Sequence, residues 1–294
     1  MASTTIEEKQ KTFETYRFYL DCINNEIVGL KKPDQILGIY SAATTSIQGF
    51  ASFDEKWIDR WMKIAWNTEY ISTKKISDPF FARINNQWKP IQSYYCAYAA
   101  SEAAAYLIDG KCADGHDKAL AKMTDFFISR KVSPWDKAFK GARGKNGNGI
   151  KVLNFPFGIV FPSNLKRNNI DGLQMIGTCL KAEHKHRISD KYKRKSGILK
   201  YEFDPGNTGL LHFLYRLRIK SNYKDATILF EPATDGQICN FNESLDSIIY
   251  YLLMYLEIKI MRKCKKEFLI RIANDYLSMN PQADRLKNRL NLYR

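Results

Sequence analysis

Apolar residues recur at intervals of three and four along most of the chain, the spacing that places them on one face of an α-helix. Residues 6–28 show the pattern clearly, with Phe13, Tyr16 and Leu20 among the recurring positions. The same spacing predicts helices over residues 91–109, 116–131, 210–224 and 244–276, and one that starts after Ser52 or Asp54. The sequence therefore predicts a mainly α fold.

Several of these segments carry residues that are typical of helix ends. Ser52 or Asp54 can accept hydrogen bonds from the first free N–H groups of the helix that follows. Gly110 is suited to the left-handed position just after a helix, and Asn242 or Ser244 can cap the long helix near the C-terminus. These residues sharpen the predicted helix boundaries.

The character of the chain changes between residues 133 and 204, where prolines and glycines interrupt every long helical pattern. We predict an N-terminal helical segment over residues 1–84 that packs on a helical bundle over residues 85–280. A basic, loop-rich insertion at 133–204 interrupts this bundle, and a basic tail follows over residues 281–294. Small side chains in the helix over 91–109 let other helices approach closely, which predicts a central position for it.

The chain carries 46 Lys and Arg against 31 Asp and Glu, a formal net charge of +15 that attracts polyanions. Nucleic acid is the first expectation, an anionic membrane surface is the second, and a basic protein without either ligand is the alternative. Residues 181–200 combine many cations with tyrosines, which suits either a phosphate-binding surface or a solvated loop. The candidate phosphate contacts there are Lys185, Arg187, Lys193, Arg194 and Lys195.

Three tryptophans, Trp57, Trp61 and Trp66, fall close together in the second predicted helix. Their indole rings could stack on nucleic-acid bases. Tryptophans at helical spacing are more often part of a core, which is the favoured interpretation.

Residues 210–224 combine an apolar stripe, with Leu210, Leu214 and Leu217 at helical spacing, with a concentration of polar side chains. The polar candidates on these turns and at their exit are His212, Arg216, Arg218, Lys220, Asn222 and Tyr223. A helix with an apolar stripe and a set of cationic and polar side chains beside it suits an anionic ligand. A surface helix with solvated charges is the alternative.

Other classes of protein are not favoured by the sequence. The six cysteines occur singly, and neither a Cys nor a carboxylate cluster accompanies His184 and His186, so we predict no metal site and no cofactor. The N-terminus lacks the apolar core of a secretory signal, and the best apolar run, residues 248–256, is too short to span a bilayer. A cytoplasmic protein without a membrane partner is expected.

Three features, over roughly residues 85–132 and 205–268, together resemble the HEPN superfamily, the small α-helical bundles of prokaryotic defence and toxin proteins; one of them is the long helix from Ser244, which would close such a bundle. The segment Tyr94-Tyr95-x-Ala97-Tyr98 and the helix after it are similar to the second and third helices of that family. Residues 215–223 are similar to its last helix but one. The resemblance implies an HEPN-like helical bundle that acts on or binds RNA, often as a dimer.

Active HEPN ribonucleases carry an arginine, four to six residues, and then a histidine. This pair positions the RNA and activates its 2′-hydroxyl without a metal. At the matching place the chain has Arg216, five residues and Asn222, and none of its four histidines has an arginine five to seven residues before it. An asparagine cannot shuttle a proton near neutral pH, so the departure argues against nuclease activity.

We therefore expect a non-catalytic, nucleic-acid-binding HEPN-like protein, with RNA as the favoured ligand, in a prokaryotic defence or toxin–antitoxin type complex. One alternative is a metal-independent endoribonuclease that uses His212 with Arg216 or Arg218, in which Tyr223 helps to orient the phosphate. His212 and Arg216 are four residues apart and thus on one helical face. Another alternative is a structural subunit whose aromatic faces contact a protein partner or a second copy.

Overall fold

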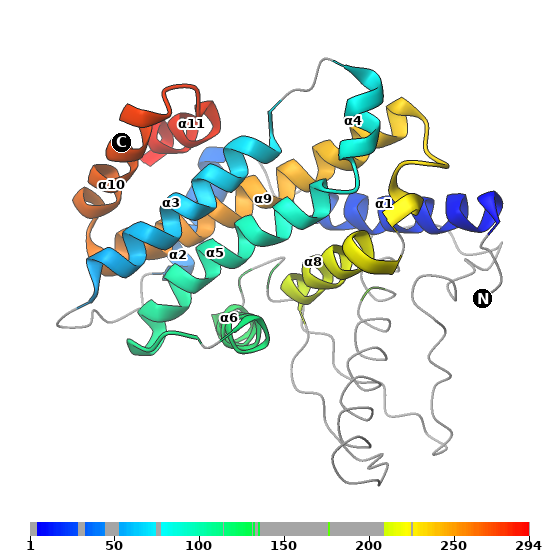
Figure 1. Ribbon diagram of the computed structural model, residues 1–294. Helices are drawn as coiled ribbons and strands as arrows, with labels where there is room; N and C mark the ends of the chain where they lie inside the picture. Colours follow the sequence, from blue (N-terminus) through cyan, green and yellow to red (C-terminus); the bar gives the residue numbers. More distant parts are fainter. Residues whose placement is uncertain are drawn as a thin grey trace, which may run out of the picture.

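The computed structural model is mainly helical in the part of the chain that it describes, and contains no strand there (Figure 1). It describes residues 5–28, 33–44, 53–74, 78–113, 115–130, 132, 135, 176, 209–224 and 226–293. The prediction of a mainly α fold is confirmed.

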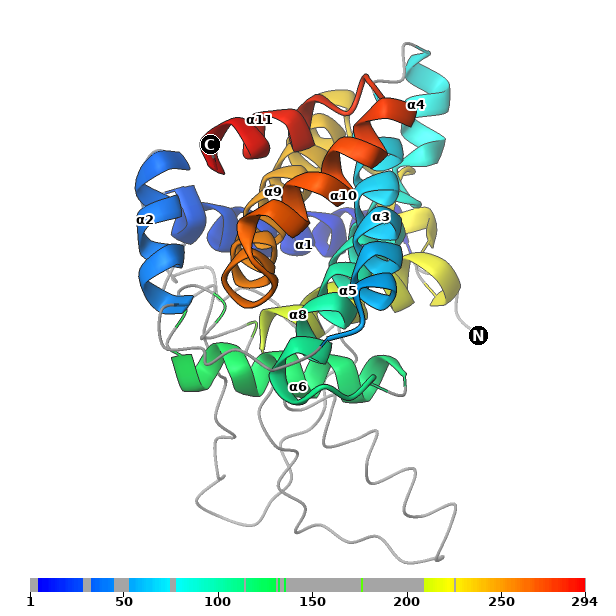
Figure 2. The same cartoon turned by 90° about the vertical axis from the view of Figure 1, so that its left-hand side faces the viewer.

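The helices pack together in space, some of them antiparallel and others crossing at larger angles (Figures 1 and 2). They are α1 (Ile6–Val28), α2 (Pro33–Thr44), α3 (Glu55–Ser72), α4 (Pro79–Asn85), α5 (Lys89–Asp109), α6 (His116–Arg130), α8 (Leu210–Ile219), α9 (Asp235–Cys264), α10 (Lys266–Met279) and α11 (Asp284–Tyr293). A π-helical turn (Lys220–Lys224) and a short 3₁₀ turn (Ala226–Leu229) lie in the segment between α8 and α9.

Helices α5 and α9 form the centre of the fold. Helix α5 packs against α3, α6, α8 and α9, and its run of small residues, including Ala99, Ala100 and Ala103, is almost fully buried. Helix α9 has 30 residues, and every side chain from 252 to 260 is buried. A helix buried on all sides belongs in the interior of a fold. Helices α1, α2 and α10 also pack on α9 and cover its other sides.

Two helix ends are as predicted from the sequence. The Asp54 carboxylate accepts hydrogen bonds from the backbone N–H groups of Lys56 and Trp57, at 2.9 and 3.2 Å, and caps α3. Gly110 has a φ of 72° and ends α5 in the left-handed conformation. Both predictions are confirmed.

The long C-terminal helix differs from its prediction. Its N-terminal cap is the reciprocal pair of Thr234 and Gln237, so α9 begins well before Asn242 or Ser244. The backbone then breaks at Lys265, which has a φ of 73°, and α10 follows as a separate helix. The apolar spacing continues across the break because Cys264 and the start of α10 contact the same core.

Of the helices in the described residues, three fall where the sequence pattern predicts none, namely α2, α4 and α11. Helix α11 lies within residues 281–294, expected as a basic tail, and its Arg289 is fully buried. The predicted insertion at 133–204 lies outside the described residues, apart from Trp135 and Ile176.

Candidate nucleic-acid interface

Aromatic rings from α3, α5, α6 and α8 form a continuous chain of contacts, which we call the aromatic belt. The belt consists of Trp57, Trp61, Tyr94, Tyr95, Tyr98, His116 and Tyr215. Helices α3 and α5 lie side by side, with α6 and α8 packed on α5 (Figure 1). The belt therefore crosses four helices that are distant in sequence.

The first half of the belt runs from α3 to α6. The ring centroids of Trp57 and Trp61 are 5.8 Å apart, and those of Trp61 and Tyr98 are also 5.8 Å apart. The His116 ring lies only 4.1 Å from that of Tyr98. Trp57 and Trp61 share one face of α3 because they are four residues apart on a helix of 3.6 residues per turn. Both are half-buried, whereas Trp66 is 1% exposed. Of the three tryptophans, Trp66 is the fully buried one.

The second half of the belt surrounds His116, the first residue of α6. The Tyr94 hydroxyl and the Nδ1 atom of His116 are 2.6 Å apart, and the Tyr215 ring lies 5.3 Å from that of Tyr94. Tyr94 is buried, but Tyr95 beside it is 37% exposed. Burial raises the pKa of Tyr94 well above its ordinary value, so its hydroxyl stays neutral. The belt thus presents neutral rings to solvent, and the hydrogen bond between Tyr94 and His116 holds its buried side in place.

Tyr98 lies one helical turn from Glu102, a carboxylate of the same helix that is 1% exposed. Burial and, next, this carboxylate raise the pKa of Tyr98, so the phenol of this belt residue stays neutral.

Arg218 on α8 provides a positive charge at one end of the belt. Its guanidinium lies 5.6 Å from the Tyr94 ring, 5.1 Å from the Tyr95 ring and 5.9 Å from the Tyr215 ring. Its Nη2 donates a hydrogen bond of 2.8 Å to the Tyr95 hydroxyl. Within the described part of the chain no carboxylate forms an ion pair with Arg218, and its buried Nε has no hydrogen-bond partner there. This charge is available to an anion.

The structure separates the two arginines that the sequence groups together. Residues two apart on a helix point in directions about 200° apart, so Arg216 and Arg218 cannot share a face of α8. Arg216 is 9% exposed and its guanidinium lies 5.6 Å from the Tyr215 ring. Arg218 is half-buried and faces the belt. A phosphate therefore has much better access to Arg218.

His212 is engaged in the start of α8. Its Nδ1 atom accepts a hydrogen bond of 3.2 Å from the backbone N–H of Gly209 and lies 3.4 Å from the Thr124 hydroxyl. The side chain at the third helical position thus satisfies the N–H of the capping residue. The geometry gives His212 a structural role.

The remaining predicted residues lie beyond α8 or outside the described part. Asn222 is exposed in the π-helical turn, Lys220 is half-buried at its start, and Tyr223 is described there by its backbone alone. The five cations of the insertion lie outside the described residues, as do both histidines near them, and their phosphate-binding role stays a prediction. These residues are Lys185, Arg187, Lys193, Arg194, Lys195, His184 and His186.

Sequence reasoning missed His116 as a member of the site. The HEPN motif pairs a histidine with an arginine a few residues earlier in the chain, whereas Tyr94 and Arg218 reach the cluster around His116 from α5 and α8. The signal that could have found it is its position as the first residue of a helix that follows the tyrosine-rich segment.

A second polar cluster lies at the other end of the fold, between α3, α9 and α11. The Arg289 guanidinium is fully buried and donates to both oxygens of Glu69, at 2.7 and 2.8 Å, and of Glu257, at 2.8 and 3.0 Å. The Trp66 indole N–H and the Tyr293 hydroxyl also donate to Glu257, at 2.8 and 2.6 Å. Every carboxylate oxygen of this cluster therefore has a donor.

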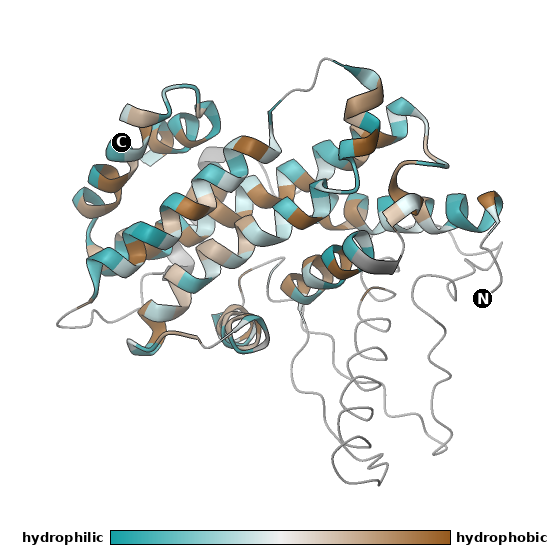
Figure 3. Cartoon of the chain, in the orientation of Figure 1, coloured by the Kyte–Doolittle hydropathy of each residue, from teal (hydrophilic) through white to brown (hydrophobic). Residues whose placement is uncertain are grey.

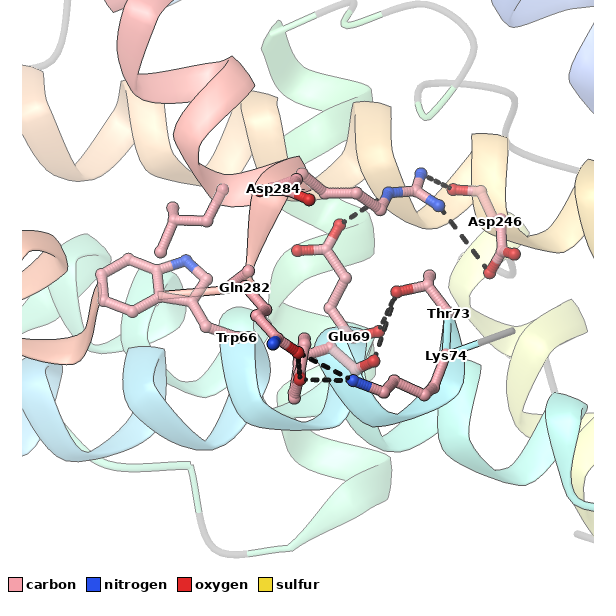
Figure 4. A pocket seen from close by; sticks show the side chains of 11 residues that line it. Trp66, Glu69, Thr73, Lys74, Asp246, Gln282 and Asp284 are labelled. Carbon is pink, nitrogen blue, oxygen red and sulfur yellow. Dashed lines mark hydrogen bonds and ion pairs between the residues drawn. The ribbon is translucent and has the colours of Figure 1, made fainter. Parts of the chain in front are cut away.

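A cavity of about 540 Å³ borders this cluster (Figure 4). Arg285 spans its rim, 3.3 Å from the Glu69 carboxylate and 3.9 Å from that of Asp246. Lys89 pairs with Asp246 at 2.6 Å. The cations and carboxylates of the cluster thus neutralise one another, which marks it as a structural ion network.

No group of three or more metal-ligating side chains is present among the described residues. No helix in that part of the chain is long and apolar enough to cross a membrane.

Comparison of the chain with models of known protein families, with curated proteins and with solved structures yields no match.

Proposed function

We propose that this protein binds single-stranded nucleic acid, with RNA as the favoured ligand, along the aromatic belt. The observation that carries the proposal is Arg218, a guanidinium held over tyrosine rings without a carboxylate partner among the described residues. A phosphate would supply the missing negative charge, and the half-buried rings beside it would stack on the adjoining bases.

The energetics of both contacts suit this ligand. Each base stacked on an aromatic side chain contributes about 1–3 kcal/mol with little dependence on sequence. The net charge of +15 adds a long-range attraction and the release of counterions from the phosphates. Single strands are favoured over duplexes because their bases are free to contact protein rings.

The proposal is for binding without cleavage. His212 is occupied in capping α8, and Asn222 stands where the HEPN motif has its histidine. The tyrosines of the belt on α5 belong to the segment that resembles the HEPN family, and this supports an HEPN-like RNA-binding role. Action within a prokaryotic defence or toxin–antitoxin type complex is part of the same proposal.

The test is a fluorescence-anisotropy titration with a labelled single-stranded RNA of about 15 nucleotides, a length typical of such sites. We expect Arg218→Ala to weaken binding roughly 10-fold to 100-fold, because a charge-assisted hydrogen bond is lost. The slope of log K against log salt should fall by about 0.7, the value for one phosphate contact on a single strand.

Lys287→Ala is the matched control, because it removes one positive charge from α11, which lies far from α8 in both views (Figures 1 and 2). Equal affinities for Arg218→Ala and Lys287→Ala would contradict the proposed site. Metal-independent RNA cleavage by the wild type that disappears in His212→Ala or His116→Ala would contradict binding without cleavage.

A further inference from the structure

Accessible positive charge over the aromatic belt is concentrated at one end, on α8. This helix carries both hydrophobic and hydrophilic residues (Figure 3). The guanidinium of Arg218, in its last turn, lies 5.1 to 5.9 Å from three tyrosine rings. Among the described residues no cation lies over the rings of Trp57, Trp61 or Tyr98. A ligand on the belt therefore meets this charge at the α8 end.

The guanidinium of Arg218 is open to a ligand along one edge. Its Nη2 atom donates a hydrogen bond of 2.8 Å to the Tyr95 hydroxyl, and its Nε atom is buried without a hydrogen-bond partner among the described residues. The Nη1 atom is not buried, and no described group accepts a hydrogen bond from it. The site therefore offers the N–H groups of Nη1 to an anion.

A phosphate at the end of a strand fits such a one-sided site better than a phosphate within the strand. A terminal phosphate is joined to one nucleotide and has its other oxygens free, whereas an internal phosphate has a nucleotide on each side. A terminal phosphate also carries a charge of about −1.5 to −2 near pH 7, against a single charge for each internal phosphate. Its hydrogen bonds to a guanidinium are therefore the stronger ones.

The middle of the belt carries the opposite charge. Glu102, one turn beyond Tyr98 on α5, is 1% exposed, and a buried carboxylate repels a nearby phosphate more strongly than one in water. Exposed cations occur again on α3, where Lys56 and Arg60 are next in sequence to the two tryptophans of the belt. A strand whose bases stack on the belt therefore keeps the phosphates over α5 in solvent, and the phosphate at its end meets Arg218.

We propose that Arg218 binds the terminal phosphate of a single-stranded RNA, so that this protein recognises a phosphorylated strand end. The first base then stacks on Tyr95, whose ring is 37% exposed and lies beside the guanidinium. This inference rests on the proposed function and specifies which part of the RNA reaches Arg218.

Competition for the wild-type protein tests the proposal. The probe is an RNA of about 15 nucleotides with an internal fluorescent label, and its displacement is followed by anisotropy. The unlabelled competitors share one sequence and length and carry a phosphate at the 5′ end, at the 3′ end or at neither end. We expect one of the two phosphorylated RNAs to displace the probe at an about 10-fold lower concentration than the other two competitors, because its end phosphate enters the site.

Arg218→Ala should abolish this advantage, and Lys287→Ala, the control of equal charge on α11, should keep it. Arg218→Lys retains the charge without the planar pair of nitrogens and should reduce the advantage, which provides a second variant if the first does not fold. Far-UV circular dichroism measures the folding of each variant.

Two kinds of failure are distinguishable. Equal competition by all three RNAs, or an advantage that persists in Arg218→Ala, overturns this inference while RNA binding itself stands. Absence of binding by every RNA overturns the proposed function and this inference with it.

Discussion

The buried ion network around Arg289 gives the sharpest prediction about stability. Arg289→Met keeps most of the apolar volume of the side chain but removes four hydrogen bonds to Glu69 and Glu257. Both carboxylates are 3% exposed or less. Removing one partner of a buried ion pair leaves an uncompensated charge and costs about 3–5 kcal/mol of unfolding free energy.

The partners that remain set the size of this effect. Glu69 keeps a contact of 3.3 Å with Arg285, whereas Glu257 keeps only the neutral donors of Trp66 and Tyr293. Glu257 therefore bears most of the loss. We expect the unfolding free energy to fall by about 4 kcal/mol and the melting temperature by roughly 10 °C.

Urea unfolding followed by far-UV circular dichroism at several pH values measures the effect. In Arg289→Met the Glu257 carboxylate has no cationic partner and should have a folded-state pKa above that of the unfolded chain, because burial disfavours its charge. The folded state then binds more protons than the unfolded state, so the variant loses stability relative to the wild type as the pH rises from acid to neutral.

Arg271→Met is the control, since it breaks an exposed ion pair with Glu55 in which both side chains are more than half exposed. A change within about 0.5 kcal/mol is expected for such a surface substitution. A cost for Arg289→Met no larger than that of the control, or one that is independent of pH, would refute the reasoning.

Two further predictions concern α9 and the belt. Lys259 is fully buried, donates to the Ala104 carbonyl at 2.7 Å and forms no ion pair with a described carboxylate. Burial lowers the pKa of Lys259 in the folded state well below its ordinary value. Between the folded-state and unfolded-state pKa values the unfolded chain therefore binds more protons, so the stability of the wild type should rise with pH in that window. Unfolding curves measured from neutral to alkaline pH would show this rise. Lys259→Met should remove this dependence and stabilise the protein at neutral pH; an unchanged pH profile would exclude the assignment. Tyr95→Ala should weaken RNA binding by about 1–3 kcal/mol in the anisotropy titration, whereas Tyr70→Ala, on α3 beside the cavity, should not.

Local structure was predictable from the sequence where it depends on residues a few positions apart. The apolar spacing over residues 6–28 predicts α1 with the observed bounds. Asp54 and Gly110 mark helix ends because a cap acts only on the turn beside it. Helix α4 was not predicted because its apolar side faces solvent. The break at Lys265 was not predicted because the apolar spacing continues through it.

The candidate site was predictable only in part. The sequence indicated Arg218 and the positive charge, but it grouped Arg216 with Arg218 and gave neither His116 nor the tyrosines of α5 a place in the site. Which arginine is accessible depends on how α8 is rotated against α5, and that rotation is set by side-chain packing between them.

The helical class of this protein, several helix boundaries and its cationic character follow directly from the amino-acid sequence, because these properties depend on composition and on neighbours along the chain. Only the folded structure places Arg289 between Glu69 and Glu257, and brings rings of α5 and α8 together around Arg218. Glu69 and Arg289 are 220 positions apart. Such pairs leave no periodic signal in a sequence, because the packing of whole helices brings them together.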